Sequence, residues 1–184
     1  EDATGRTLDL LAGATDADLD PLSVNDVTVT AVGGDPATVG FSVSGGVLTL
    51  GDGQFDALDP GDTLTLTVGY DVSDGTVDVP ASATITIDGA NDLPQITSPA
   101  AFTPDENQTL VGTVTATDPD ADDTRTFTIT GGADATNIAI DPNTGVLSFA
   151  AAPNFEVKAD ANGDGVYVVE VTVEDSQGAT DVQT

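Results

Sequence analysis

The chain contains no cysteine, histidine, methionine or tryptophan, and it has only three basic residues among 184. Without cysteine or histidine it has no disulfide, no ordinary zinc site and no Ser-His-Asp or Cys-His nucleophile. No apolar run approaches the roughly 20 residues of a membrane-spanning helix. These absences exclude most nucleophilic hydrolases, zinc enzymes and a helical membrane span within this sequence.

The shortage of positive charge leaves 32 acidic residues against three basic ones, a net charge of −29. Such a surface repels phosphate backbones and anionic lipids, which excludes nucleic acid as a partner. Five of the acids are Glu, and the remaining 27 are Asp. Aspartate favours turns and caps, and its short side chain is a good oxygen ligand. A solubilising or salt-adapted surface would carry the same charge, so the charge alone does not establish a metal site.

Six segments alternate between apolar residues and Thr or other polar residues, as half-buried antiparallel strands do. They are residues 24–32, 63–68, 83–87, 111–117, 126–130 and 166–173. Asp-Gly, Gly-Gly and Pro-Asn pairs separate them, and no helical stripe is present. With 39% hydrophobic residues the chain has enough apolar side chains for a core. The sequence therefore predicts an all-β protein.

The two halves of the sequence repeat one another at an offset of 99 to 102 residues. The matching pairs are Gly46-Val47-Leu48 with Gly145-Val146-Leu147, Phe55-Asp56 with Phe155-Glu156, Asp74 with Asp175, and Thr15-Asp16-Ala17-Asp18 with Thr117-Asp118-Pro119-Asp120. Units of this length with about seven short strands suit immunoglobulin-like Greek-key sandwiches. We expect two tandem β-sandwich domains, residues 1–92 with a linker at 88–94, and residues 93–184 with an incomplete last strand.

The repeated positions are mostly acids at the ends of strands. Each half has an Asp-x-Asp after an early strand, an acid after a Phe, and an Asp that closes a late strand. Calcium takes six to eight oxygen ligands, chiefly carboxylates and carbonyls, and tandem sandwiches can supply them from their facing ends and the linker. A single Asp-x-Asp often does no more than bond to its own backbone. The ordered set, present twice, favours calcium.

This order of acids resembles that of cadherin repeats. The segment Ile85-Thr86-Ile87-Asp88-Gly89-Ala90-Asn91-Asp92-Leu93-Pro94 is similar to the close of bacterial cadherin-like and VCBS-type repeats, and residues 11–22 are similar to their opening. Residues 154–156 and 160–175 resemble later motifs of bacterial cadherin domains. The resemblance covers nearly the whole chain. Such repeats occur in large secreted surface proteins of bacteria, including RTX-type adhesins, in which calcium stiffens long arrays.

The resemblance implies one interdomain calcium cluster and two half-sites. The cluster would use Glu1 or Asp2, Asp56, Asp88, Asn91, Asp92, Asp118, Asp120 and Asp175. Asp16, Asp18 and Asp74 would face a preceding repeat, and Glu106 and Glu156 would face a following one. Cadherins of animals have an Asn-Asp-Asn run where this chain has Ala90-Asn91-Asp92, so the resemblance implies fewer ions here.

A separate candidate is the loop Asp160-Ala161-Asn162-Gly163-Asp164-Gly165. It matches the first half of an EF-hand loop, but the twelfth position is Val171 instead of Glu, which excludes an EF-hand. Two interpretations remain. Asp160, Asn162 and Asp164 bind an ion, as in similar runs of bacterial cadherin domains, or the loop is a Gly-rich turn.

We expect a calcium-binding structural segment of a secreted adhesin on the cell surface, with calcium, neighbouring repeats, and surface glycans or like repeats on another cell as partners. The alternative is a calcium-dependent carbohydrate-binding module, but the lack of tryptophan disfavours it. An enzyme is not expected, although paired carboxylates occur in glycosidases, because the acids cluster at the predicted domain ends.

Overall fold

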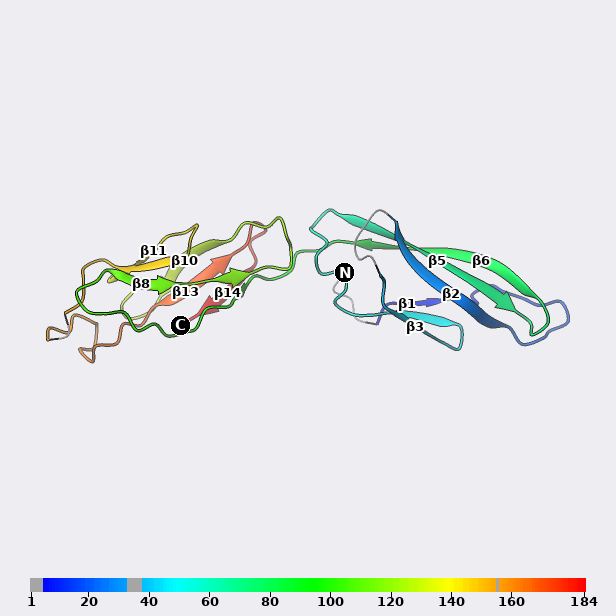
Figure 1. Ribbon diagram of the computed structural model, residues 1–184, viewed down its shortest axis with the longest axis horizontal. Coiled ribbons are helices and arrows are strands. Elements are labelled where there is room, and N and C mark those ends of the chain that lie inside the picture. The colour runs from blue at the N-terminus through cyan, green and yellow to red at the C-terminus, as the bar shows by residue number, and fades with distance from the viewer. Residues whose placement is uncertain (1–4, 33–37, 155) are drawn as a thin grey trace. The chain divides into compact units, whose positions relative to one another are not determined.

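The computed structural model describes residues 5–32, 38–154 and 156–184. The chain divides into two compact units, unit 1 (Glu1–Ala90) and unit 2 (Asn91–Thr184), shown in Figure 1. Every regular element in the described ranges is a β-strand. The prediction of an all-β protein built from tandem β-sandwiches is therefore confirmed.

The described residues of unit 1 form six strands in two three-stranded antiparallel sheets. The strands are β1 (Thr7–Asp9), β2 (Ser23–Val32), β3 (Phe41–Ser44), β4 (Val47–Leu50), β5 (Thr63–Ser73) and β6 (Asp78–Asp88). One sheet has the order β1-β4-β3 and the other the order β2-β5-β6. The apolar side of the alternation is buried, and Leu48, Leu66, Val68 and Ile87 are fully enclosed in one core.

Unit 2 repeats this arrangement and adds a short pair of strands. Its strands are β7 (Gln95–Ile96), β8 (Leu110–Thr113), β9 (Ala116–Thr117), β10 (Thr126–Gly131), β11 (Ile138–Ile140), β12 (Val146–Phe149), β13 (Glu170–Glu174) and β14 (Thr180–Gln183). The sheets have the orders β11-β12-β8 and β10-β13-β14, and β7 pairs with β9. A second core includes Val114, Phe127, Leu147 and Val173.

Backbone geometry explains why the repeated Gly-Val-Leu motif begins with glycine in both units. Gly46 and Gly145 directly precede β4 and β12, and both have left-handed backbone angles, with φ of 80° and 68°. A Cβ on Gly145 would lie 2.2 Å from the carbonyl oxygen of Val114. Only glycine tolerates both the angle and the close approach, so this part of the repeat reflects strand geometry.

Strand β2 shows a bulge that the simple alternation does not predict. Val27, Val29 and Ala31 share one face by parity, whereas Val24 is of opposite parity, yet all four pack against the core. The pairing of β2 with β5 shifts between Asn25 and Thr28, and Asp26 has a φ of 51°. The extra residue turns Val24 back to the buried face.

Two predicted strands of unit 2 are shorter than their alternating segments. Residues 111–117 divide into β8, which pairs with β12, and β9, which pairs with β7. The chain therefore changes partners near Val114, whose N–H bonds to the Gly145 carbonyl. Residues 166–173 form a strand only from Glu170, although Tyr167 and Val169 pack against the core.

Candidate metal centre

Three separate segments of unit 2 bring acidic and amide side chains to one end of its sheets. Asp118, Asp120 and Asp123 lie in the loop that follows β9, Asp175 directly follows β13, and Asn91 and Asp92 precede β7. One carboxylate oxygen from each of Asp118, Asp120 and Asp123 lies within 4.8 Å of the others. We call these six residues the acidic cluster.

Hydrogen bonds join the segment before β7 to the two acidic loops. The amide Nδ2 of Asn91 donates to Asp175 Oδ2 at 2.8 Å, and the main-chain N–H of Asp92 donates to Asp120 Oδ2 at 2.8 Å. Asp120 is 1% exposed and Asp175 is 5% exposed. The structure thus brings together five of the residues that the sequence predicts as ligands, all within unit 2.

Local turns hold the carboxylates in place. Asp118 Oδ1 accepts the N–H of Asp120 at 3.1 Å. Asp175 Oδ1 accepts the N–H groups of Gln177 and Ala179 at 2.9 and 2.8 Å. These bonds use one oxygen of each carboxylate and follow from the preference of aspartate for turns. They leave the second oxygen of each side chain to face the cluster.

Three buried oxygens of the acidic cluster receive no hydrogen bond from the described part of the chain. They are Asn91 Oδ1, Asp118 Oδ2 and Asp123 Oδ2. Buried polar atoms in folded proteins nearly always have a partner, and an unsatisfied one costs about 1–3 kcal/mol. All three are acceptors. A hard cation that takes oxygen ligands fits this donor set, whereas an anion does not.

The pKa of Asp118 also favours a cation at the acidic cluster. Burial raises its pKa, and the negative charges of Asp120, Asp123 and Asp175 raise it further, against one N–H bond that lowers it. The pKa of Asp175 is instead lowered. Burial opposes its ionisation, but the Asn91 amide and the N–H groups of Ala179 and Gln177 outweigh that effect. The cluster thus holds crowded carboxylates whose charges disfavour one another.

Sequence reasoning missed Asp123, which the structure places in the cluster with Asp118 and Asp120. Its Oδ1 also accepts a hydrogen bond from the Ser176 hydroxyl, next to Asp175. The signal was available in the run Asp118-Pro119-Asp120-Ala121-Asp122-Asp123, but the sequence does not say which of the last two aspartates points inward. Loop geometry decides this.

The corresponding acids of unit 1 have the same turns and greater exposure. Asp16 Oδ1 accepts the N–H of Asp18 at 2.8 Å, and Asp74 Oδ1 accepts the N–H groups of Thr76 and Val77 at 2.7 Å each. Asp18 is exposed, and Asp16 and Asp74 are half-buried. These hydrogen bonds lower the pKa of Asp74, the Thr76 hydroxyl contributing most. The described residues of unit 1 do not form a buried group like the acidic cluster.

At the other end of unit 1, two of the acids predicted as ligands, Asp56 and Asp88, lie within the described residues. Asp56 is half-buried, and Asp88 ends β6 with an exposed side chain whose Oδ1 accepts the Thr63 hydroxyl at 3.2 Å. Asp59, which the sequence did not single out, has a buried Oδ1 with no hydrogen bond from the described residues. Glu1, Asp2 and Phe155 lie outside the described residues. Glu106 and Glu156 are exposed in unit 2.

The loop at 160–165 uses its carboxylates to bind its own backbone. Asp160 Oδ2 and Oδ1 accept the N–H groups of Asp164 and Gly165 at 2.8 and 2.9 Å. Burial opposes ionisation of Asp160, but these N–H groups lower its pKa. Asn162 Nδ2 donates to Asp164 Oδ2 at 2.9 Å. These hydrogen bonds explain the motif as that of a turn. The binding of an ion in this loop stays a prediction.

A residue outside the motif, Asp134, anchors this loop to the sheet. It is 2% exposed, and its two carboxylate oxygens accept the N–H groups of Ala161 and Val168 at 2.6 and 2.8 Å. We expect Asp134→Ala to destabilise unit 2 by about 1–3 kcal/mol, because two N–H groups lose their partner. Thermal unfolding measures this loss, and a calcium titration should give unchanged affinity.

Asp141 is the matched control, because its exposed carboxylate caps the N–H groups of Asn143 and Thr144 in the same manner. Water can replace it there, so we expect Asp141→Ala to cost less than half as much stability. Equal losses for the two variants would contradict the role given to Asp134.

The described residues include no helix long and apolar enough to cross a membrane. No curated protein matches the chain significantly. Among solved structures, Drosophila N-cadherin EC1-4 is 17% identical with a TM-score of 0.47, the match covering 98% of this chain and 43% of that one. Mouse cadherin-23 EC22-24 is 19% identical with a TM-score of 0.44, covering 88% of this chain and 51% of that one. This chain therefore spans about half or less of these two structures.

The family comparison concerns unit 2. The family model described as "Bacterial Ig domain" matches residues 91–184, just over half of the chain. These are the residues that form the compact unit Asn91–Thr184 with its two packed sheets and the acidic cluster. The chain belongs to the bacterial Ig domain family.

Proposed function

We propose that the acidic cluster binds calcium and that the chain is a structural repeat segment of a secreted or surface-attached bacterial adhesin. The observation that carries the proposal is the set of three buried acceptor oxygens on Asn91, Asp118 and Asp123 without a hydrogen-bond donor. Asp120 and Asp175 would supply further carboxylate oxygens. Extracellular modules bind calcium with dissociation constants of about 0.1–1 mM, and we expect the same range here.

The mechanism we infer is electrostatic. A chain with a net charge of −29 repels itself, and the Asp118 carboxylate is crowded by three others. A bound calcium ion would neutralise these charges and join the segment before β7 to the loops after β9 and β13. Asn91 and Asp92 are the first residues of unit 2, so ordering them also orders the connection to unit 1. In an array of repeats, this would limit bending between neighbours.

A calcium titration tests the proposal. Isothermal calorimetry should show binding in the range above, and calcium at about 100 times the dissociation constant should stabilise unit 2 by about 2.7 kcal/mol. For a domain of this size, that corresponds to a rise in melting temperature of about 10 °C or more. Sodium chloride at equal ionic strength is the control. An equal rise in sodium chloride would show screening of surface charge and contradict a specific site.

A further inference from the structure

The loop at residues 160–165 contains the one Asn-Gly pair of the sequence, Asn162-Gly163. The chain has seven asparagines, and a residue with a side chain follows each of the other six. Asparagine loses its amide when the main-chain nitrogen of the next residue attacks the side-chain carbonyl carbon and closes a five-membered ring. A side chain on that next residue hinders the attack, and glycine has none. Asn162 is therefore the asparagine of this chain whose sequence most favours the reaction.

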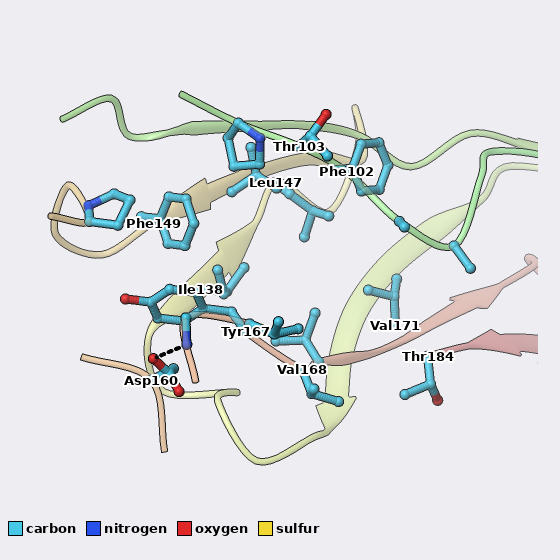
Figure 2. A pocket seen from close by; sticks show the side chains of 18 of the residues that line it. Phe102, Thr103, Ile138, Leu147, Phe149, Asp160, Tyr167, Val168, Val171 and Thr184 are labelled. Carbon is cyan, nitrogen blue, oxygen red and sulfur yellow. Dashed lines mark hydrogen bonds between the residues drawn. The ribbon is translucent and has the colours of Figure 1, made fainter. Parts of the chain in front are cut away.

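Residues 161–166 are exposed, although both ends of this segment are held in unit 2. Asp160 is 7% exposed and Tyr167 packs against the core, and Figure 2 shows both lining one cavity. Gly163 has a φ of 75°, and a Cβ on it would meet nothing within 4 Å. Water can therefore reach Asn162 and Gly163, and a cyclic intermediate has room to form between them.

Asp164 contacts the two atoms of the Asn162 amide whose charge changes in this reaction. Its main-chain N–H donates to Asn162 Oδ1 at 3.0 Å, where negative charge develops as the ring closes. Its Oδ2 accepts a hydrogen bond from Asn162 Nδ2 at 2.9 Å, where positive charge develops as the nitrogen leaves. Polar groups that are already aimed at developing charge lower the barrier to a reaction. Both contacts of Asp164 therefore favour loss of the amide.

We propose that Asn162 is a self-modification site, at which the chain converts this asparagine into aspartate or isoaspartate with water as the only co-reactant. The Gly163 nitrogen forms a bond to Cγ of Asn162, and its proton passes through water to Nδ2, which leaves as ammonia. The product is a cyclic imide. Water then adds to one of the two imide carbonyl groups and breaks its bond to the nitrogen, which opens the ring and leaves a new carboxylate.

The conversion changes the charge of the loop where its carboxylates already gather. The amide that donates to Asp164 Oδ2 becomes an oxygen that cannot donate, so two carboxylates face one another. Asp160 in the same loop accepts the N–H groups of Asp164 and Gly165. Repulsion between like charges loosens the loop, and hydrogen exchange at these two amides should become about tenfold faster, as a local loss of about 1.4 kcal/mol would give.

The test incubates the unaltered chain at neutral pH and follows each asparagine peptide by mass spectrometry, which distinguishes an acid from an amide. The Asn162 peptide should convert faster than any other, and faster in the folded chain than in urea. Asp164→Ser should slow the conversion about tenfold, or about 1.4 kcal/mol, because the carboxylate at Nδ2 is lost. Serine can still accept the N–H of Val166, which Asp164 Oδ1 accepts at 2.7 Å. Asn162→Gln is the matched control, since it keeps an amide but cannot close a five-membered ring.

Conversion of the Asn162 peptide no faster than that of the other asparagine peptides would overturn the proposal. Faster conversion in urea would also overturn it, because the folded loop would then protect the amide, and this comparison needs no variant. Unchanged or faster conversion in Asp164→Ser would show that Asp164 does not assist. Asn162→Asp reproduces the product, so the Asp164 and Gly165 amides of that variant should exchange as fast as those of the converted chain, and exchange at the rate of the unaltered chain would contradict the predicted loosening.

Discussion

Replacing Asp118 by asparagine is expected to make unit 2 more stable than in the unaltered chain when a chelator removes calcium. In the presence of calcium, the same variant is expected to make unit 2 less stable than in the unaltered chain. Without the ion, the variant removes a carboxylate charge that the fold disfavours, because burial raises the pKa of Asp118 and the negative charges of Asp120, Asp123 and Asp175 raise it further. We expect the melting temperature to rise by about 2–4 °C, or about 0.5 kcal/mol. With calcium, the loss of a charged ligand should lower affinity at least tenfold, about 1.4 kcal/mol.

The chain offers a direct measurement and a matched control for this reversal. Each unit contains one of the two tyrosines, Tyr70 or Tyr167, so in a Tyr70→Phe background tyrosine fluorescence follows unit 2 alone. Asp16→Asn, followed through Tyr70 in a Tyr167→Phe background, is the control, because Asp16 makes the same turn in unit 1, accepting the N–H of Asp18, where the described residues form no buried acidic cluster. A shift in the same direction with and without calcium would exclude Asp118 as a ligand.

Replacing Asp88 by alanine tests whether unit 1 shares the ions that unit 2 is proposed to hold. If Asp88 is a ligand, Asp88→Ala should lower the affinity for calcium at least tenfold, or about 1.4 kcal/mol, since it removes a carboxylate from a site with few spare ligands. Asp78→Ala is the matched control, because Asp78 and Asp88 are the exposed first and last residues of β6. Calorimetry measures both affinities.

Small-angle scattering adds a readout that affinity alone does not provide. Calcium should narrow the distribution of interatomic distances for the unaltered chain, and chelator should broaden it. Asp88→Ala should stay broad at calcium concentrations that narrow the distribution for Asp78→Ala. If both variants behave as the unaltered chain does, Asp88 takes no part and the calcium proposed here belongs to unit 2 alone.

The strands and the duplication were predictable because both rest on local patterns. Alternation over residues 63–68 and 83–87 predicts β5 and β6, and in both the apolar positions Leu66 and Ile87 are fully buried. The alternation of apolar and polar residues did not predict where a strand ends if that end depends on the length of the partner strand. Residues 166–169 have the same pattern, but no strand lies beside them in the described chain.

For the candidate site too, local sequence could select some of the residues, and tertiary contacts decided the rest. Asp118, Asp120 and Asp175 could be selected from the sequence because short turns after strands favour aspartate, and the repeat shows them twice. The same pattern selects Asp16, Asp18 and Asp74, which form turns in unit 1 without a buried cluster. Local sequence cannot separate these two sets, because the difference comes from Asn91 and Asp92, which lie against Asp175 and Asp120.

The sequence by itself determined the all-β class, the two repeats and the acids at strand ends, since periodicity and turn chemistry act over a few residues. Only the tertiary structure decided which carboxylates are buried together, that Asp123 joins them, and that Asp134 holds the loop at residues 160–165. Burial and hydrogen bonding in the acidic cluster depend on residues that lie far apart in the sequence, such as Asn91 and Asp175, which are separated by 84 positions. No local pattern encodes such contacts.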